Sequence, residues 1–190
     1  MSLTLGVLAS GRGSNFLAVQ KEIEAGRLDA TIAVLISDRE HAPALDLARE
    51  HGIKSVHHAY DRSDRTVFEK AAAETLEAHD CDLMLLAGFM RILTPDFINR
   101  FPGKILNIHP SLLPSFKGLH PQQQALDAGV KFSGCTVHVV TAELDAGPIV
   151  AQAVVPVEDE DNEDTLSARI LEKEHTIYAE AIREIERRQS

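Results

Sequence analysis

Residues 3–15 read Leu-Thr-Leu-Gly-Val-Leu-Ala-Ser-Gly-Arg-Gly-Ser-Asn, and this stretch decides the fold. Its first seven residues form an apolar run of strand length, which a glycine-rich turn follows. Apolar residues with helical spacing come next, at Phe16, Leu17, Val19 and Ile23. A strand, a glycine turn and a helix in this order are typical of the first unit of a parallel sheet that helices cover.

The alternation of strand and helix patterns continues along the chain. Strands are expected over 31–37, 54–57, 82–87 and 104–108, and helices over 43–51, 64–79 and 95–100. Prolines and a glycine between Pro110 and Pro121 predict a loop. Beyond it we expect a helix over 122–127, antiparallel strands over 133–140 and 148–157, and a last helix from Thr165 to about Arg187. The fold class is therefore α/β: a Rossmann-like open, mostly parallel sheet with helices on both faces and an antiparallel C-terminal strand pair.

Composition limits the kind of protein. The 190 residues are 44% hydrophobic and 25% charged, which favours one domain over 1–190 with a sizeable core. A formal net charge of −10 disfavours nucleic acid and anionic membranes as partners. The sequence has no apolar run near the ~20 residues that span a bilayer and no basic leader, so we expect a cytoplasmic location.

No metal site is expected. The two cysteines, Cys81 and Cys135, form no Cys-x-x-Cys pair, and the nine histidines are scattered. His120 and His138 therefore read as loop, core or supporting residues rather than metal ligands. A nucleophile elbow of the Gly-x-Ser-x-Gly kind is also missing from the sequence, which argues against a covalent hydrolase.

The glycine turn is a candidate anion site. Gly13, Ser14 and Asn15 lie where a first strand passes into a helix, and backbone N–H groups at such a turn can cradle one phosphate. The turn lacks the third glycine of the dinucleotide pattern and the Gly-Lys-Ser/Thr of a Walker loop. A plain tight turn explains the glycines equally well, so the alternative stays open.

A second group of polar residues lies near the expected carboxyl edge of the sheet. Asn107 and His109 are two positions apart on a predicted strand, so their side chains point to the same side. An amide donor and an imidazole that converge can stabilise a tetrahedral centre, and Asp145 could approach His109 and favour its protonated form. The alternative is an inert histidine near a sheet edge.

Five strings together resemble the 10-formyltetrahydrofolate-dependent formyltransferases, and most of all the branch that formylates a phosphoribosylglycinamide in purine synthesis. They are GRGSN at 11–15, AGFMRIL at 87–93, LNIHPSLLP at 106–114, GCTVH at 134–138 and LDAGP at 144–148. The resemblance extends from about residue 5 to residue 178. It implies that 10-formyltetrahydrofolate is the co-substrate, with no metal, and that the partners are small molecules.

The resemblance also implies a mechanism. The glycinamide amine attacks the formyl carbon, and Asn107 and protonated His109 hold the oxyanion. Asp145 favours the protonated form of His109 and orders a water that carries the proton from the amine to the leaving folate nitrogen. This chemistry belongs to a part near 101–190 that also takes part in binding folate, whereas a part near 1–100 binds phosphate.

Ligand-binding residues follow from the same resemblance. The substrate phosphate would lie against Gly13, Ser14 and Asn15, and the ribose hydroxyls against Glu174. The folate site would contain Arg65, Met90, Arg91, Ile92 and Leu93, together with Asn107. Because the protein as a whole is acidic, Arg91 is also expected to supply local positive charge for an anionic ligand.

The sequence departs from the family's pattern at two places, and three alternative functions remain. Leu171 stands where relatives often carry a polar residue, and the chain stops soon after the last helix, which leaves a monomer or a homodimer open. Methionyl-tRNA formyltransferase carries a further basic domain for which this chain has no room. Formyltetrahydrofolate deformylase carries a further N-terminal domain. A nucleotide-binding module without chemistry is the rival from another class.

Overall fold

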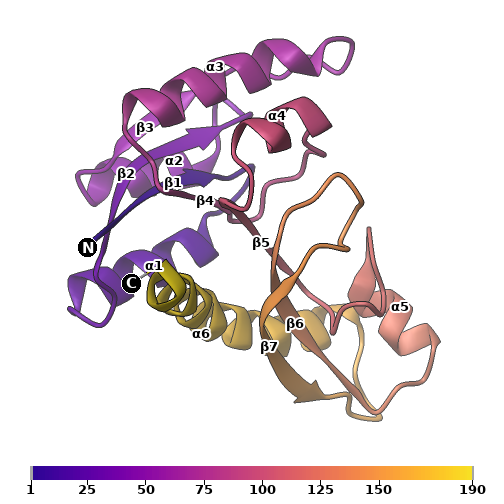
Figure 1. Cartoon of the computed structure of the whole chain (residues 1–190). Helices are drawn as coiled ribbons and strands as arrows, with labels where there is room; N and C mark the ends of the chain where they lie inside the picture. Colours follow the sequence, from indigo (N-terminus) through magenta and orange to yellow (C-terminus); the bar gives the residue numbers. More distant parts are fainter. Residues whose placement is uncertain (1, 190) are drawn as a thin grey trace. The chain divides into compact units, whose positions relative to one another are not determined.

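The computed structural model describes residues 2–189, apart from the side chains of residues 188 and 189. The strands have the order β3-β2-β1-β4-β5-β6-β7 (Figure 1). Their bounds are β1 Leu3–Leu8, β2 Ala30–Ser37, β3 Lys54–His57, β4 Leu83–Leu86, β5 Ile105–His109, β6 Phe132–Val139 and β7 Ile149–Pro156. The helices are α1 Ser14–Glu24, α2 Pro43–Glu50, α3 Arg65–Ala78, α4 Pro95–Arg100, α5 Pro121–Asp127 and α6 Glu163–Gln189.

The chain divides into two compact units, residues 1–106 and 107–190. These bounds lie close to the division near residue 100 that the sequence suggests. One formyltransferase domain over 1–190 stays a prediction. Each unit is described in turn below.

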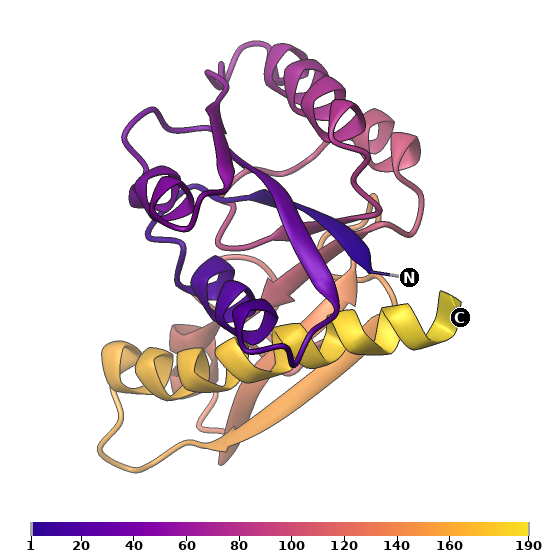
Figure 2. The ribbon, with the colours of Figure 1, turned by 90° about the vertical axis from the view of Figure 1, so that its left-hand side faces the viewer.

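The N-terminal unit is a parallel α/β arrangement. Strand β1 pairs in parallel with β2 and with β4, and β2 pairs in parallel with β3. Figure 2 shows α1 and α2 on one face of these strands and α3 and α4 on the other. The expected fold class, with helices on both faces of a mostly parallel sheet, is confirmed.

The core of this unit explains the continuous apolar runs in its strands. Leu5, Val7, Leu35 and Leu85 have no exposed surface. A parallel strand covered on both faces buries residues of either parity, so it reads as a run of apolar residues rather than an alternation. The helices supply the opposing surfaces; Phe68 of α3, for example, is 1% exposed.

The C-terminal unit is built on the antiparallel pair of β6 and β7, as expected from the sequence. Helix α6 packs against both strands, and α5 packs against α6. Helix α6 begins at Glu163, two residues before the predicted start. The reason is Asn162, whose side-chain oxygen accepts hydrogen bonds from the N–H groups of Asp164 and Thr165 and so caps the first turn.

Replacing Leu85 with alanine tests the importance of the buried sheet. We expect the free energy of unfolding to fall by about 2–5 kcal/mol, because the variant loses buried methyl groups and leaves a cavity. Urea unfolding followed by circular dichroism measures the change. The matched control is Leu119→Ala, since Leu119 is 81% exposed. Equal losses of stability in the two variants would contradict the burial pattern.

Candidate active site

The glycine turn stands between β1 and α1. Gly13 is the N-cap of α1 and adopts a left-handed conformation, with φ 79° and ψ 20°, and no side chain caps the helix there. A Cβ atom at Gly13 would also lie 2.8 Å from the Cβ of Ala44 at the start of α2. Both restrictions favour glycine. Ser14 and the buried Asn15 open the helix, so the predicted anion-binding residues lie at one helix N-terminus.

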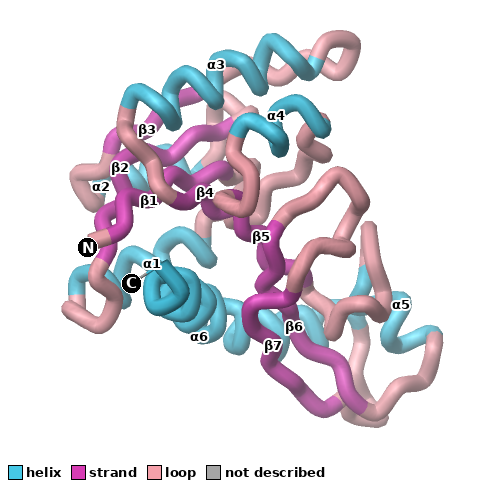
Figure 3. The backbone as a smooth tube through the Cα atoms, in the orientation of Figure 1, coloured by secondary structure: helices cyan, strands magenta, loops and turns pink. Residues whose placement is uncertain are grey.

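Residues 88–94, within the connection between β4 and α4, carry four of the predicted folate residues and have no regular secondary structure (Figure 3). We call them the β4–α4 segment. Met90 and Ile92 are 65% and 64% exposed, whereas Leu93 is buried. Arg65, the first residue of α3, donates a hydrogen bond from Nη1 to the Ile92 carbonyl at 3.4 Å. The structure therefore brings Arg65 and this segment together.

Arg91 is not an isolated positive charge. Its Nε lies 2.6 Å from Oδ2 of Asp38, whose side chain has no exposed surface. The guanidinium carbon also lies 4.3 Å from the centroid of the Tyr60 ring. The expectation that Arg91 supplies local positive charge for an anion stays a prediction, and in this structure a buried carboxylate pairs with that charge.

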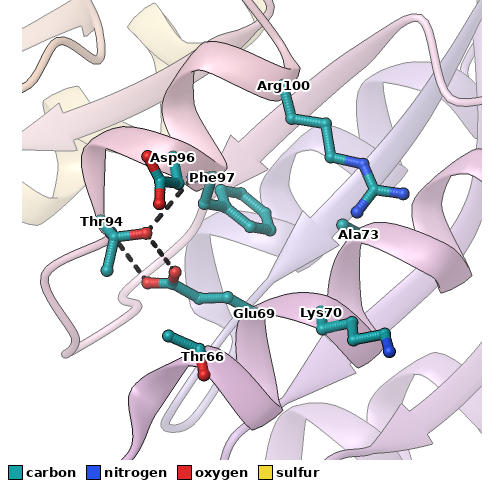
Figure 4. Close-up of a pocket in the computed structure, with 8 residues that line it drawn as sticks. All are labelled: Thr66, Glu69, Lys70, Ala73, Thr94, Asp96, Phe97 and Arg100. Atoms are coloured by element: carbon teal, nitrogen blue, oxygen red, sulfur yellow. Dashed lines mark hydrogen bonds between the residues drawn. The ribbon is translucent and has the colours of Figure 1, made fainter.

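A small cavity of about 190 Å³ lies between α3 and α4 (Figure 4). Lys70, Asp96 and Arg100 are among its lining residues, and Arg100 is paired with Glu77. Charges of both signs face it, so the lining favours no single class of ligand.

In the C-terminal unit, Asp145 faces two histidines. Oδ2 of Asp145 lies 3.5 Å from Nδ1 of His109, and Oδ1 lies 3.7 Å from Nε2 of His138. Oδ2 also accepts the N–H of Gly118 at 2.9 Å. The three carboxylate and imidazole side chains are at most 7% exposed. The predicted approach of Asp145 to His109 is thus present in the structure.

The hydrogen bond of the other ring nitrogen, Nε2, shows that this nitrogen of His109 carries a proton. Nε2 lies 2.9 Å from the carbonyl oxygen of Phe116, which can only accept, so Nε2 donates. A proton on Nδ1 as well would point toward Asp145. Both ring nitrogens thus face oxygens that accept hydrogen bonds, which suits the protonated imidazole in which both are donors.

Asn107 joins the same group through His138. Its Nδ2 lies 3.2 Å from Nε2 of His138, while Nδ1 of His138 lies 3.1 Å from the Val139 carbonyl oxygen. Asn107 is partly exposed, whereas both histidines are buried. The three predicted catalytic residues are therefore linked, and the link from Asn107 to Asp145 runs through His138.

A buried polar network supports the loop after His109. Thr136 donates to the Ser111 carbonyl at 2.7 Å and accepts from the N–H of Leu113 at 3.0 Å. Gln152 of β7 donates to Thr136 and to the Leu113 carbonyl, both at 3.0 Å. Thr136 and Ser111 have no exposed surface. Side chains of β6 and β7 thus hold the backbone that follows β5.

The environment of Asp145 favours its charged form. Burial raises the pKa of this carboxyl, but the hydrogen bond with His138, the N–H of Gly118 and the charge of His109 lower it by more, so the pKa lies below its ordinary value. Asp145 has a positive φ of 47°, a conformation that aspartate tolerates better than most residues. Two residues later, a Cβ atom on Gly147 would lie 1.8 Å from the Val139 carbonyl oxygen, so this loop lies tight against β6.

Neither thiol is a candidate nucleophile. Burial raises the pKa of Cys81 to about 11 and that of Cys135 to about 12, with nearby acidic groups adding to both shifts. One of the acids near Cys135 is Glu174 of α6, which is 7% exposed. Leu171, one turn earlier on α6, is partly exposed. Among residues 2–189, no three His, Cys, Asp or Glu side chains gather to form a metal site.

Sequence reasoning missed three residues around these positions. His138 was interpreted only as a core or supporting residue, yet it contacts both Asn107 and Asp145. His138 lies on β6, two residues from the buried Thr136. Strand alternation places both side chains on the same face, and this could have indicated that His138 belongs to the buried group. Asp38 and Glu69 gave no signal, because their partners lie 53 and 25 residues away in the sequence.

The open α/β sheet, with polar side chains beyond the carboxyl ends of its strands, is an architecture of ligand-binding and group-transfer proteins. Residues 4–182 match the model of the formyl transferase family. The chain therefore belongs to that family. No helix of the described residues is long and apolar enough to cross a membrane.

Individual relatives are similar over most of the chain. The phosphoribosylglycinamide formyltransferase of Escherichia coli (strain K12) is 40% identical over 179 residues, covering 93% of this chain and 84% of the relative. The crystal structure of glycinamide ribonucleotide transformylase 1 from Symbiobacterium toebii has a TM-score of 0.91 at 49% identity, covering 95% of this chain and 86% of that one. A formyltetrahydrofolate deformylase from Pseudomonas syringae pv. tomato also reaches a TM-score of 0.91, at 31% identity; the match covers 96% of this chain and 61% of the deformylase.

Because the pKa of Asp145 is lowered in the folded protein, its carboxylate stabilises the fold above the unfolded pKa of about 3.9, and this contribution is lost as the pH falls through the folded value. We expect Asp145→Asn to unfold more easily than the parent at pH 7, and the gap in free energy of unfolding to narrow below about pH 4. Urea titrations between pH 7 and pH 3 measure the gap.

The control for this titration is Glu143→Gln in the same loop, because Glu143 is 80% exposed and its ion pair with Lys117 is worth little. We expect that variant to follow the parent at every pH. A gap between Asp145→Asn and the parent that stays constant from pH 7 to pH 3 would contradict the lowered pKa.

Proposed function

We propose that this chain is a phosphoribosylglycinamide formyltransferase, which transfers the formyl group of 10-formyltetrahydrofolate to the amine of N1-(5-phosphoribosyl)glycinamide in de novo purine synthesis. The observation that carries the proposal is the arrangement of Asn107, His109 and Asp145 in a member of the formyl transferase family. The similarity to enzymes of that name in Escherichia coli and Symbiobacterium toebii supports the choice of substrate.

The proposed reaction is a direct attack of the amine on the formyl carbon. A new C–N bond forms, the carbonyl oxygen becomes an oxyanion, and the bond from that carbon to N10 of the folate then breaks. The amide of Asn107 stabilises the oxyanion by donating a hydrogen bond. The positive charge of protonated His109 stabilises it electrostatically, and Nε2–H of His109 donates to it only after leaving the Phe116 carbonyl. The amine loses a proton and N10 gains one, through a water that Asp145 orders.

Asp145 suits this role because it is buried and its pKa is low. A carboxylate that stays charged near neutral pH offers the Nδ1 side of the His109 ring an acceptor. His138 would act through Asp145 and Asn107, since it contacts both and is itself buried on β6.

Substrate binding is assigned to residues of both units. We propose that Gly13, Ser14 and Asn15 bind the phosphate, because they lie at the N-terminus of α1, where no side chain caps the helix. Glu174 is assigned to the ribose hydroxyls. The folate is assigned to Arg65, Met90, Arg91, Ile92 and Leu93, together with Asn107; Met90 and Ile92 offer it exposed apolar surface.

Formyltetrahydrofolate deformylase is the second candidate, because the deformylase from Pseudomonas syringae matches the whole fold closely. A deformylase passes the formyl group to water, whereas a transferase requires the amine. We also propose a cytoplasmic location, small molecules as the only partners, and no metal; a monomer and a homodimer remain equally compatible with the proposal.

The dependence of the reaction on the amine separates the two candidates. We expect purified protein to release tetrahydrofolate from 10-formyltetrahydrofolate only when phosphoribosylglycinamide is present, as followed by absorbance. Formate measured in the same samples serves as the control for hydrolysis. If tetrahydrofolate were released at equal rates with and without the amine, and formate appeared with it, the result would contradict the transferase and support the deformylase.

Replacement of His109 or Asp145 by alanine tests the mechanism. We expect each variant to lower kcat by at least roughly 100-fold, the scale of a group that stabilises an oxyanion or moves a proton. Leu144→Ala, next to Asp145 in the same loop and 50% exposed, is the matched control. Turnover near that of the parent in both catalytic variants, with the fold intact by circular dichroism, would refute the mechanism.

A further inference from the structure

The β4–α4 segment, residues 88–94, carries exposed apolar side chains on a backbone that forms no helix or strand. A segment of this kind keeps one shape only if other groups hold it. Two of its backbone N–H groups donate hydrogen bonds to side chains elsewhere in the N-terminal unit. The N–H of Met90 donates to Oγ of Ser10 at 2.8 Å, and the N–H of Thr94 donates to Oε1 of Glu69 at 2.8 Å (Figure 4).

The middle of the segment is held by a charge pair. Asp38, directly after β2, accepts a hydrogen bond from Nε of Arg91 at 2.6 Å. The Tyr60 ring lies against the guanidinium of Arg91, 4.3 Å from its carbon, and edge-on to Phe68. Phe68 in turn stacks on Phe89 of the segment itself. Arg91 is therefore fixed at one edge by a carboxylate and on one face by an aromatic ring.

The burial of Asp38 makes this pair obligatory. Its side chain has no exposed surface, and among the described residues its second oxygen, Oδ1, has no hydrogen-bond partner. If a buried carboxylate loses its cation, no interaction offsets the free-energy cost of removing its charge from water. Arg91, in contrast, keeps 22% of its side chain exposed. Asp38 thus fixes the position of Arg91 rather than the reverse.

We propose that Asp38 is a positioning residue for the folate co-substrate. By holding Arg91, it fixes the backbone between Met90 and Leu93 and presents Met90 and Ile92 as a preformed apolar surface for the aromatic part of the folate. The proposal rests on the proposed function. It assigns no charged contact between Asp38 and the ligand, and it assigns the Arg91 side chain to anchoring the segment.

The test measures the KM for 10-formyltetrahydrofolate, the KM for phosphoribosylglycinamide and kcat in three variants. We expect Asp38→Ala to raise the folate KM by about tenfold, while the other two parameters stay within about twofold. Asp38→Asn keeps an oxygen for Arg91 and should recover much of the loss. Glu77→Ala is the control, because it breaks an exposed ion pair with Arg100 on the same unit.

An unchanged folate KM in Asp38→Ala and Asp38→Asn would overturn the proposal. So would an equal loss in all three parameters that follows the loss of folded protein, since that is the signature of a structural role alone. If Asp38→Ala and Asp38→Asn do not fold, Arg91→Lys replaces them, because it leaves a cation beside the buried carboxylate but removes the Nε–H donor and the planar guanidinium that lies against Tyr60. A folate KM raised by about threefold supports the proposal, and an unchanged one overturns it.

A double variant tests whether Asp38 acts through Arg91. We expect Asp38→Ala and the double variant Asp38→Ala/Arg91→Met to show the same folate KM, because Arg91 has already lost its anchor in the single variant and neither protein contains an unpaired buried carboxylate. Effects that add independently would overturn the route through Arg91.

Calorimetric titration with 10-formyltetrahydrofolate distinguishes a failure of the proposed function from a failure of the proposed role of Asp38. If the parent transfers no formyl group but binds the folate more tightly than Asp38→Ala, the proposed function fails and the role of Asp38 stands. If the parent transfers the formyl group and both proteins bind the folate equally, only the role of Asp38 fails.

Discussion

One buried carboxylate, that of Asp145, joins three segments of the C-terminal unit. It faces His109 at the end of β5 and His138 on β6, and it accepts the N–H of Gly118 from the loop between them in the sequence. A charge removed from water is tolerated only when donors surround it, so these contacts have to form together. The position of each catalytic candidate in this unit is therefore coupled to the others, and a change at any of them alters the whole group.

Much of the fold follows from the sequence because the signals are local. The apolar run at Leu3–Leu8, the glycine turn and the spacing of Phe16 and Val19 each depend on residues a few positions apart. The polar sites were partly predictable for the same reason, since Asn107 and His109 share one strand. The role of His138 and the pairing of Asp38 with Arg91 were not, because they depend on which distant strands become neighbours.

Each unit contains an irregular segment that carries candidate functional groups and that polar side chains from elsewhere hold in place. In the N-terminal unit, the β4–α4 segment has exposed apolar side chains, and polar anchors from Ser10, Asp38 and Glu69 hold its backbone. In the C-terminal unit, the loop after His109 is held by the buried hydroxyl of Thr136 and the amide of Gln152. In both, loops that carry candidate functional groups gain their order from regular strands and helices rather than from their own sequence.

The two thiols have a practical consequence. Thiolate, not thiol, is the form that reacts with alkylating reagents. With a pKa of about 11 for Cys81 and about 12 for Cys135, only about one molecule in ten thousand at Cys81, and fewer at Cys135, carries a thiolate at pH 7. A cysteine introduced at an exposed position, with an ordinary pKa, would therefore react with a fluorescent or spin label faster than either native thiol.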